Sequence, residues 1–80
     1  MARYCFHAER DGESTFDDEG SVLPDLQAAK RIALKAAAEM AADDLASGVQ
    51  HLQQFVLVED ELGLAGLRIS VEAVLEVQST

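Results

Sequence analysis

Residues 3–29 read RYCFHAERDGESTFDDEGSVLPDLQAA and contain the signals for a strand pair, a turn and the start of a helix. Aromatic or apolar side chains alternate with polar ones over residues 3–8, which predicts a strand. Asp11 and Gly12 supply the residues of a hairpin turn, because glycine adopts a positive φ without a steric penalty. A short second strand over residues 13–17 is therefore expected to pair back with the first.

One helix is expected between Pro24 and Gly48. Proline is tolerated in a first helical turn, Asp25 can cap the N-terminus, and glycine commonly ends a helix. One face of this helix would carry small and apolar side chains, which let a helix lie close to a sheet. Its members are Leu26, Ala29, Ala33, Ala37, Met40 and Ala41. Ile32 points away from this face and is either an isolated surface isoleucine or the start of a second apolar stripe used in self-association.

The second half of the chain predicts further strands. After a polar connector that is expected over residues 48–54, residues 55–58 are uninterrupted apolar residues, as in a strand that is covered on both faces. After a turn bounded by glycines, residues 67–71 alternate between apolar and polar, which predicts a strand with one solvated face. A short turn is expected over residues 72–74, and residues 75–77 are a candidate for one more edge strand.

These elements predict a single α+β domain over residues 1–80, in the order β-β-α-β-β with residues 75–77 as the candidate fifth strand. One amphipathic helix would pack on one face of a four-stranded, mainly antiparallel sheet. Because alanine buries little area, the core is expected to come from aromatic side chains and from the Leu, Ile and Val residues of the second half. The aromatic core candidates are Tyr4, Phe6, Phe16 and Phe55.

Composition limits the classes of function. A core built from 80 residues leaves little net stability, so oligomerisation is expected. With 15 acidic and 6 basic side chains, the formal net charge of −9 disfavours binding to nucleic acid or to an anionic membrane, and a basic protein partner fits it better. The sequence shows no signal peptide and no membrane-spanning apolar run, and its single cysteine suits a reducing compartment. We therefore expect a cytoplasmic protein.

Arg3, Cys5 and His7 leave the same face of the first predicted strand, because side chains alternate along a strand. A thiol beside an imidazole can act as nucleophile and base or as two metal ligands, although a structural zinc needs two further ligands. The other interpretation is a packed cysteine and a hydrogen-bonded histidine. Whether this face meets the helix or another molecule is left open by the sequence.

Asp17, Asp18 and Glu19 form an acidic turn that ends in Gly20. Three carboxylates could hold a hard cation such as calcium or magnesium, but they also suit a solvated turn, and the alternating oxygen ligands of an EF-hand loop are absent. The sequence contains no phosphate loop, dinucleotide-binding glycine motif, nucleophile elbow or HExxH motif. No catalytic residue, cofactor or small-molecule substrate is assigned.

Several segments together resemble one protein family. They are RYCFH at 3–7, DDEG at 17–20, LPDL at 23–26 and FVLVEDELGLAGLRISV at 55–71. The family consists of short, uncharacterised bacterial proteins, chiefly alphaproteobacterial, which begin RYFFH or RYYFH and continue through DxxG into LPDLxxAR; it is classed as a domain of unknown function. The resemblance implies no activity, substrate or site residue. LPDL and the alanine-spaced helix also resemble antitoxins of the HicB type in architecture, and fold does not imply function.

Two hypotheses about function follow. The first is a non-enzymatic protein-interaction or structural module that self-associates through the uncovered face of the sheet, through an edge strand or through Ile32. Its expected partner is a second copy or another protein. The alternative is a small metal-binding or redox-responsive protein that uses Cys5 and His7.

Overall fold

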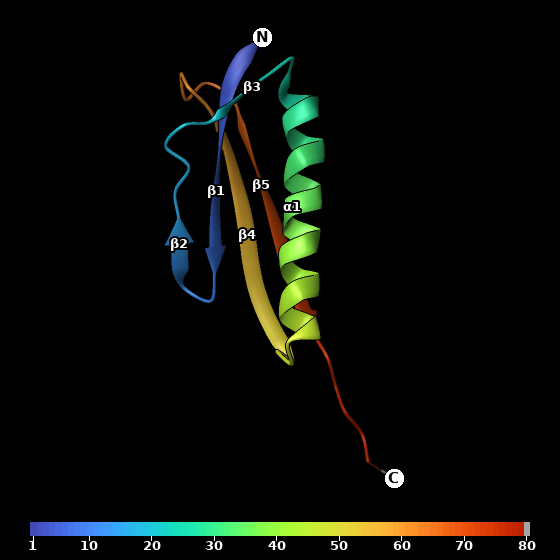
Figure 1. Cartoon of the computed structure of the whole chain (residues 1–80). Helices are drawn as coiled ribbons and strands as arrows, with labels where there is room; N and C mark the ends of the chain where they lie inside the picture. Colours follow the sequence, from blue (N-terminus) through green and yellow to red (C-terminus); the bar gives the residue numbers. More distant parts are fainter. Residues whose placement is uncertain (80) are drawn as a thin grey trace.

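The computed structural model describes residues 1–79 as one antiparallel sheet with one long helix packed against it (Figure 1). The helix runs lengthwise along the sheet, and residues 75–79 extend away from it (Figure 1). The elements are β1 (Ala2–Arg10), β2 (Glu13–Thr15), β3 (Ser21–Leu23), α1 (Leu26–Ala46), β4 (His51–Asp60) and β5 (Gly66–Val74).

The sheet has the order β2-β1-β4-β5, and β3 also pairs with β1. β4 follows one edge of β1 from Tyr4 to Arg10, while β3 and β2 share the other edge. β4 and β5 form a long hairpin in which Phe55 lies opposite Ser70. This arrangement confirms the predicted α+β class and the packing of one helix on one face of an antiparallel sheet.

The core lies between α1 and the sheet. Ala29, Ala33 and Ala37 are buried on the helix, and Tyr4 and Val58 are buried on the strands that face it. Methyl side chains keep the contact layer thin, so the helix approaches the sheet closely along the predicted alanine face. Leu26 and Met40 complete that face as partly buried residues.

Asp25 and Gly48 mark the ends of the helix as predicted, whereas Pro24 precedes the N-cap and lies outside the first turn. The Asp25 carboxylate accepts a hydrogen bond from the Ala28 N–H at 2.9 Å. At the other end, Gly48 has a φ of +105°, a conformation that ends helices and that glycine adopts without a Cβ clash. Among residues 1–79, no helix is long and apolar enough to cross a membrane.

The strand predictions for the second half need correction. β4 already begins at His51, within the segment expected to be a connector, and β5 therefore has a partner along its whole length to Val74. Residues 72–74 are thus in a strand and not in a turn. Residues 75–77 form no strand, because Val74 pairs with the first residue of β4 and, within residues 1–79, no strand continues beside the residues that follow. The sheet does contain a fifth strand, but it is β3, which pairs with β1.

The expected aromatic core is also only partly correct. Tyr4 is buried and Phe6 packs against the core. Phe16 is 70% exposed, because it follows the end of β2, where the chain leaves the edge of β1. Phe55 is partly buried, but it lies on the face of β4 that points away from α1. The helix takes its aliphatic contacts from Val56 and its neighbours instead.

Candidate functional site

The sheet has one face that α1 does not cover, which we call the open face. Along β1 the buried Tyr4 points to the helix, so Arg3, Cys5 and His7 lie on the opposite, open face. β4 adds alternate residues from His51 to Glu59, and β5 adds alternate residues from Arg68. The three predicted β1 residues therefore share a face, as expected, and that face is the uncovered one.

Asp17 organises the acidic turn beside β1. Its Oδ1 accepts hydrogen bonds from the N–H groups of Gly20 at 3.0 Å and Glu19 at 3.3 Å. Its Oδ2 accepts from the N–H of Phe6 at 3.1 Å. Phe6 lies between the residues of β1 that pair with β3 and those that pair with β2, so the Asp17 carboxylate replaces a strand partner there. These hydrogen bonds, led by the one from Gly20, lower the pKa of Asp17.

The predicted residues of β1 and of the turn hold each other in place. Arg3 Nη1 donates to the Glu19 carbonyl oxygen at 2.7 Å, and the Asp17 N–H donates to His7 Nδ1 at 3.2 Å. Gly20 passes so close to β1 that an added Cβ would lie 2.9 Å from the Tyr4 carbonyl oxygen. These residues therefore have a folding role: their hydrogen bonds and close packing cover the edge of β1 between β3 and β2.

His7 and Cys5 do not form a hydrogen-bonded nucleophile and base in the described structure. His7 Nδ1 is occupied as an acceptor, and Nε2 lies 3.6 Å from a carboxylate oxygen of Glu59. A neutral imidazole that accepts at Nδ1 carries its proton on Nε2, which suits a contact with that carboxylate. Over residues 1–79, no group of three or more His, Cys, Asp and Glu side chains is placed to hold a metal ion.

The side chains of Asp18 and Ile32 take no part in the hydrogen bonds described above. Asp18 is an exposed residue of the acidic turn. Ile32 is on the helix, 45% exposed, and so on the other side of the sheet from Cys5 and His7. Its exposure agrees with the predicted orientation, but it places Ile32 on a different surface from the remaining candidates.

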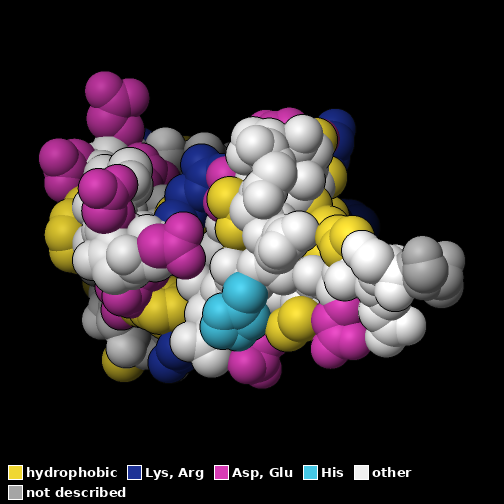
Figure 2. Space-filling view, turned by 90° about the horizontal axis from the view of Figure 1, so that it is seen from below, with side chains coloured by type: hydrophobic (Ala, Val, Ile, Leu, Met, Phe, Trp, Pro, Cys, Tyr) yellow, Lys and Arg dark blue, Asp and Glu magenta, His cyan; other side chains and the backbone are white. Residues whose placement is uncertain are grey.

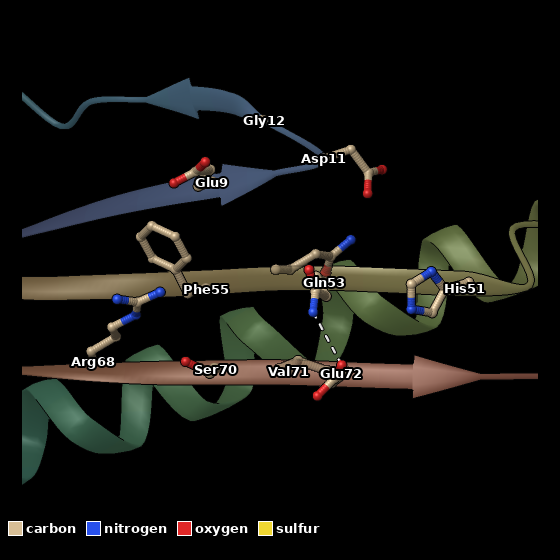
Figure 3. Close-up of a pocket in the computed structure, with 11 residues that line it drawn as sticks. Glu9, Asp11, Gly12, His51, Gln53, Phe55, Arg68, Ser70, Val71 and Glu72 are labelled. Atoms are coloured by element: carbon tan, nitrogen blue, oxygen red, sulfur yellow. Dashed lines mark hydrogen bonds between the residues drawn. The ribbon is translucent and has the colours of Figure 1, made fainter.

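Phe55 lies on the open face between two shallow hollows of about 440 and 430 Å³ that share it and Glu9. Arg68 stacks over its ring, with the guanidinium carbon 4.0 Å from the ring centroid (Figure 3). On its other side, the rings of His7 and Phe16 lie 5.6 Å apart. Both hollows are open to solvent, and the face combines aromatic surface with a few charged side chains.

Acidic side chains outnumber basic ones in the whole chain, 15 to 6. Figure 2 views the molecule from one end and shows many Asp and Glu side chains with few Lys and Arg among them. This agrees with the formal net charge of −9. Arg68 is one of only six basic side chains, so it is a distinctive charge for a partner to contact.

A partly buried polar cluster at the C-terminal end of the helix was not predicted from the sequence. Asp44 accepts hydrogen bonds from Arg10 Nη2 at 2.5 Å and from the buried side-chain amide of Gln54. Asp44 thereby links α1 to β1 through Arg10 and to β4 through Gln54. These contacts stabilise the end of the helix, and spacing along the sequence does not predict them because the three residues lie far apart in it.

The two edges of the sheet differ. The edge of β1 is covered by two strands of three residues each and by the Asp17 turn. β5 has nine residues, and within the described residues 1–79 it pairs with β4 alone. We call its other side the free edge. Long unpaired edges are uncommon in monomers, because they present a row of hydrogen-bonding groups to other strands.

Comparison with known proteins identifies the family. A family model described as a domain of unknown function (DUF6894) matches residues 3–72. The chain belongs to this family. No curated protein and no solved structure matches it. The match confirms the resemblance to a family of unknown function that was inferred from the N-terminal motifs.

The range shared with the family contains both features described above. It includes the whole Asp17 turn, and it extends through Arg68 and Glu72 on β5. The turn residues were predicted from the sequence, whereas those of the free edge were not. Alternation over residues 67–71 predicted the strand, yet an edge strand is recognised only when the order of the sheet is known.

Proposed function

We propose that this chain is a non-enzymatic protein-interaction or structural module that self-associates through its sheet. The observation that carries the proposal is the free edge of β5, which spans nine residues from Gly66 to Val74. Strands with unpaired backbone groups bind a further strand by continuing the sheet, and this requires no catalytic group or cofactor.

The contrast between the edges supports this proposal. β2 and β3 are short, and Asp17 satisfies the N–H of Phe6 between them, so that edge offers little backbone for pairing. β5 contains no proline and no glycine after Gly66. One edge is therefore protected against added strands, and the other is suited to receive one.

The open face is a second surface that supports protein binding. Phe55 and Leu57 are only partly buried there, and Phe16 is largely exposed beside them. A chain of 80 residues gains stability when such apolar surface is covered by a second molecule. Ile32 provides a smaller exposed apolar site on the helix.

Two finer assignments belong to the same proposal. The segments RYCFH, DDEG and LPDL support the proposal that the chain is one of the short bacterial proteins, chiefly alphaproteobacterial, that this family resemblance implies. Its single cysteine favours a reducing compartment such as the cytoplasm. We assign no nucleic-acid, membrane or small-molecule partner, because the net charge of −9 disfavours the first two and no site residue points to the third.

Light scattering across a concentration series tests the proposed function. The expected result is a mass that rises with concentration from the 8.6 kDa of one chain toward twice that value. Measurements belong at physiological ionic strength or above, where the Debye length of about 8 Å or less limits repulsion between two acidic chains. A mass that stays at one chain at every concentration would contradict the proposal.

A further inference from the structure

The backbone hydrogen bonds of the β4–β5 hairpin determine which groups β5 presents at its free edge. The Leu75 N–H donates to the Gln50 carbonyl oxygen at 2.6 Å, and the Asp60 N–H donates to the Ala65 carbonyl oxygen at 3.0 Å. Bonded and non-bonded pairs alternate along an antiparallel ladder. The odd-numbered residues of β5 consequently direct their backbone groups toward β4, and the even-numbered residues direct theirs to the free edge.

We propose that β5 pairs antiparallel with β5 of a second copy, about a two-fold axis at Ser70. Ser70 is the middle residue of the strand Gly66–Val74, so this register pairs every residue of the strand. The residues that direct their backbone groups to the junction are then paired with one another, even-numbered with even-numbered, and each such pair can exchange two hydrogen bonds. The inference rests on the proposed function and adds the partner, the strand and the register.

Charge complementarity selects this register. With Ser70 opposite its counterpart, Arg68 lies opposite Glu72 of the second copy, and the symmetric pair forms on the other side of the axis. Opposite charges directly across a sheet stabilise the pairing, whereas like charges destabilise it. Each charge is already held on the open face, since Arg68 stacks over Phe55 and Glu72 accepts a hydrogen bond from Gln53 at 3.1 Å (Figure 3).

The side chains facing the helix also match. In the same register, Ile69 lies opposite Val71 of the second copy, and Leu67 lies opposite Ala73. All four side chains are partly buried in one chain, and a neighbouring strand would cover them further. A two-fold axis perpendicular to the sheet keeps α1 on the same face in both copies, so the apolar layer continues across the junction.

The other registers lack this match. A shift by two residues in either direction places Arg68 opposite Val74 or Ser70, and both charge pairs are lost. Parallel pairing in register would align Arg68 with its own counterpart, which places like charges side by side. A second copy in the two-fold register is therefore the occupant that the charges of β5 favour.

Charge reversal tests the register. In R68E the glutamate introduced at position 68 lies opposite Glu72 of the second copy. In E72R the arginine introduced at position 72 lies opposite Arg68 of the second copy. We expect each variant to weaken dimerisation by about tenfold or more, because two attractive pairs become repulsive. The double variant R68E/E72R restores opposite charges and should recover dimerisation. An equimolar mixture of R68E with E72R should form heterodimers, since their edges are then complementary.

Matched controls lie on the exposed side of the helix. K35E and E39R change the net charge by the same amounts as R68E and E72R, at residues that pair with each other 3.9 Å apart on α1. They should leave dimerisation unchanged. If a β5 variant does not fold, as judged by circular dichroism, S70P provides the second test. The Ser70 N–H points to the free edge, so proline removes a hydrogen bond of the junction and none within the chain.

The measurement is the dimer dissociation constant from sedimentation velocity for the wild type, the variants and the mixture. Loss in both single variants, with recovery in the double variant and in the mixture, is the expected result. A wild-type dimer that tolerates charge reversal and S70P would overturn the register while leaving the proposed self-association intact. A wild-type chain that never dimerises would overturn both.

Discussion

Replacing Gly20 by alanine tests the account of the acidic turn. Gly20 has a φ of +71°, where a side chain costs about 1–2 kcal/mol. The new Cβ would also lie 2.9 Å from the Tyr4 carbonyl oxygen and 3.2 Å from Cys5 Sγ, and relief of such crowding costs about 1–3 kcal/mol. We expect G20A to lower the free energy of unfolding by about 2–5 kcal/mol. The total free energy of unfolding of a domain of this size is only about 4–12 kcal/mol.

Gly12 provides the matched control. It has a φ of +85° in the hairpin turn, but nothing lies within 4 Å of an added Cβ. G12A should therefore cost only the conformational part, about 1–2 kcal/mol. Urea unfolding followed by circular dichroism, at one protein concentration for all variants, measures the difference. Equal losses in G12A and G20A would refute the inference that close approach to β1 makes glycine necessary at position 20.

Three further outcomes follow from individual contacts. D25A should lower the free energy of unfolding by about 1 kcal/mol in urea titrations, because it removes the N-cap of α1. D44A should cost about 1–3 kcal/mol by the same assay, because the buried Gln54 amide loses its acceptor and Arg10 keeps only the Met40 carbonyl oxygen; no loss would contradict a stabilising cluster. The lowered pKa of Asp17 predicts stability that is present above its ordinary value of 3.8 and lost as pH falls through the folded value. D17N should flatten this dependence, and an unchanged pH profile of unfolding would argue against it.

The helix and the first hairpin were predictable because their signals act locally. Asp25 caps α1 through a residue three positions away. Asp11 and Gly12 both have positive φ and join β1 to β2 in a two-residue turn. Alternation in β1 also placed Tyr4 on the opposite face from its neighbours, as the burial confirms.

The other strands depended on partners far away in the sequence. β3 has three residues, too few for a recognisable alternation, and it exists because residues 2–4 of β1 lie beside it. Gln53 and Gln54 suggested a connector, yet both are in β4, where Gln54 reaches the cluster at Asp44. Pairing with this longer β4 in turn extends β5 to Val74.

In the candidate site, too, features set by local sequence were predictable and features set by distant contacts were not. That Arg3, Cys5 and His7 share a face follows from the period of a strand, and the sequence predicted it. Which face the helix covers depends on packing of the whole sheet, and the sequence left it open. The role of Asp17 as a partner for the backbone of Phe6 likewise requires the gap between β2 and β3.

Amide hydrogen exchange along β5 is a direct test of whether its free edge pairs with a second copy. The N–H groups of Arg68, Ser70 and Glu72 point to the free edge, whereas those of Ile69 and Val71 point to β4. Two-dimensional NMR should show that protection of the first set rises with protein concentration, while the second set is protected at every concentration. Fast exchange of the first set at all concentrations, with the second set protected, would contradict pairing through β5.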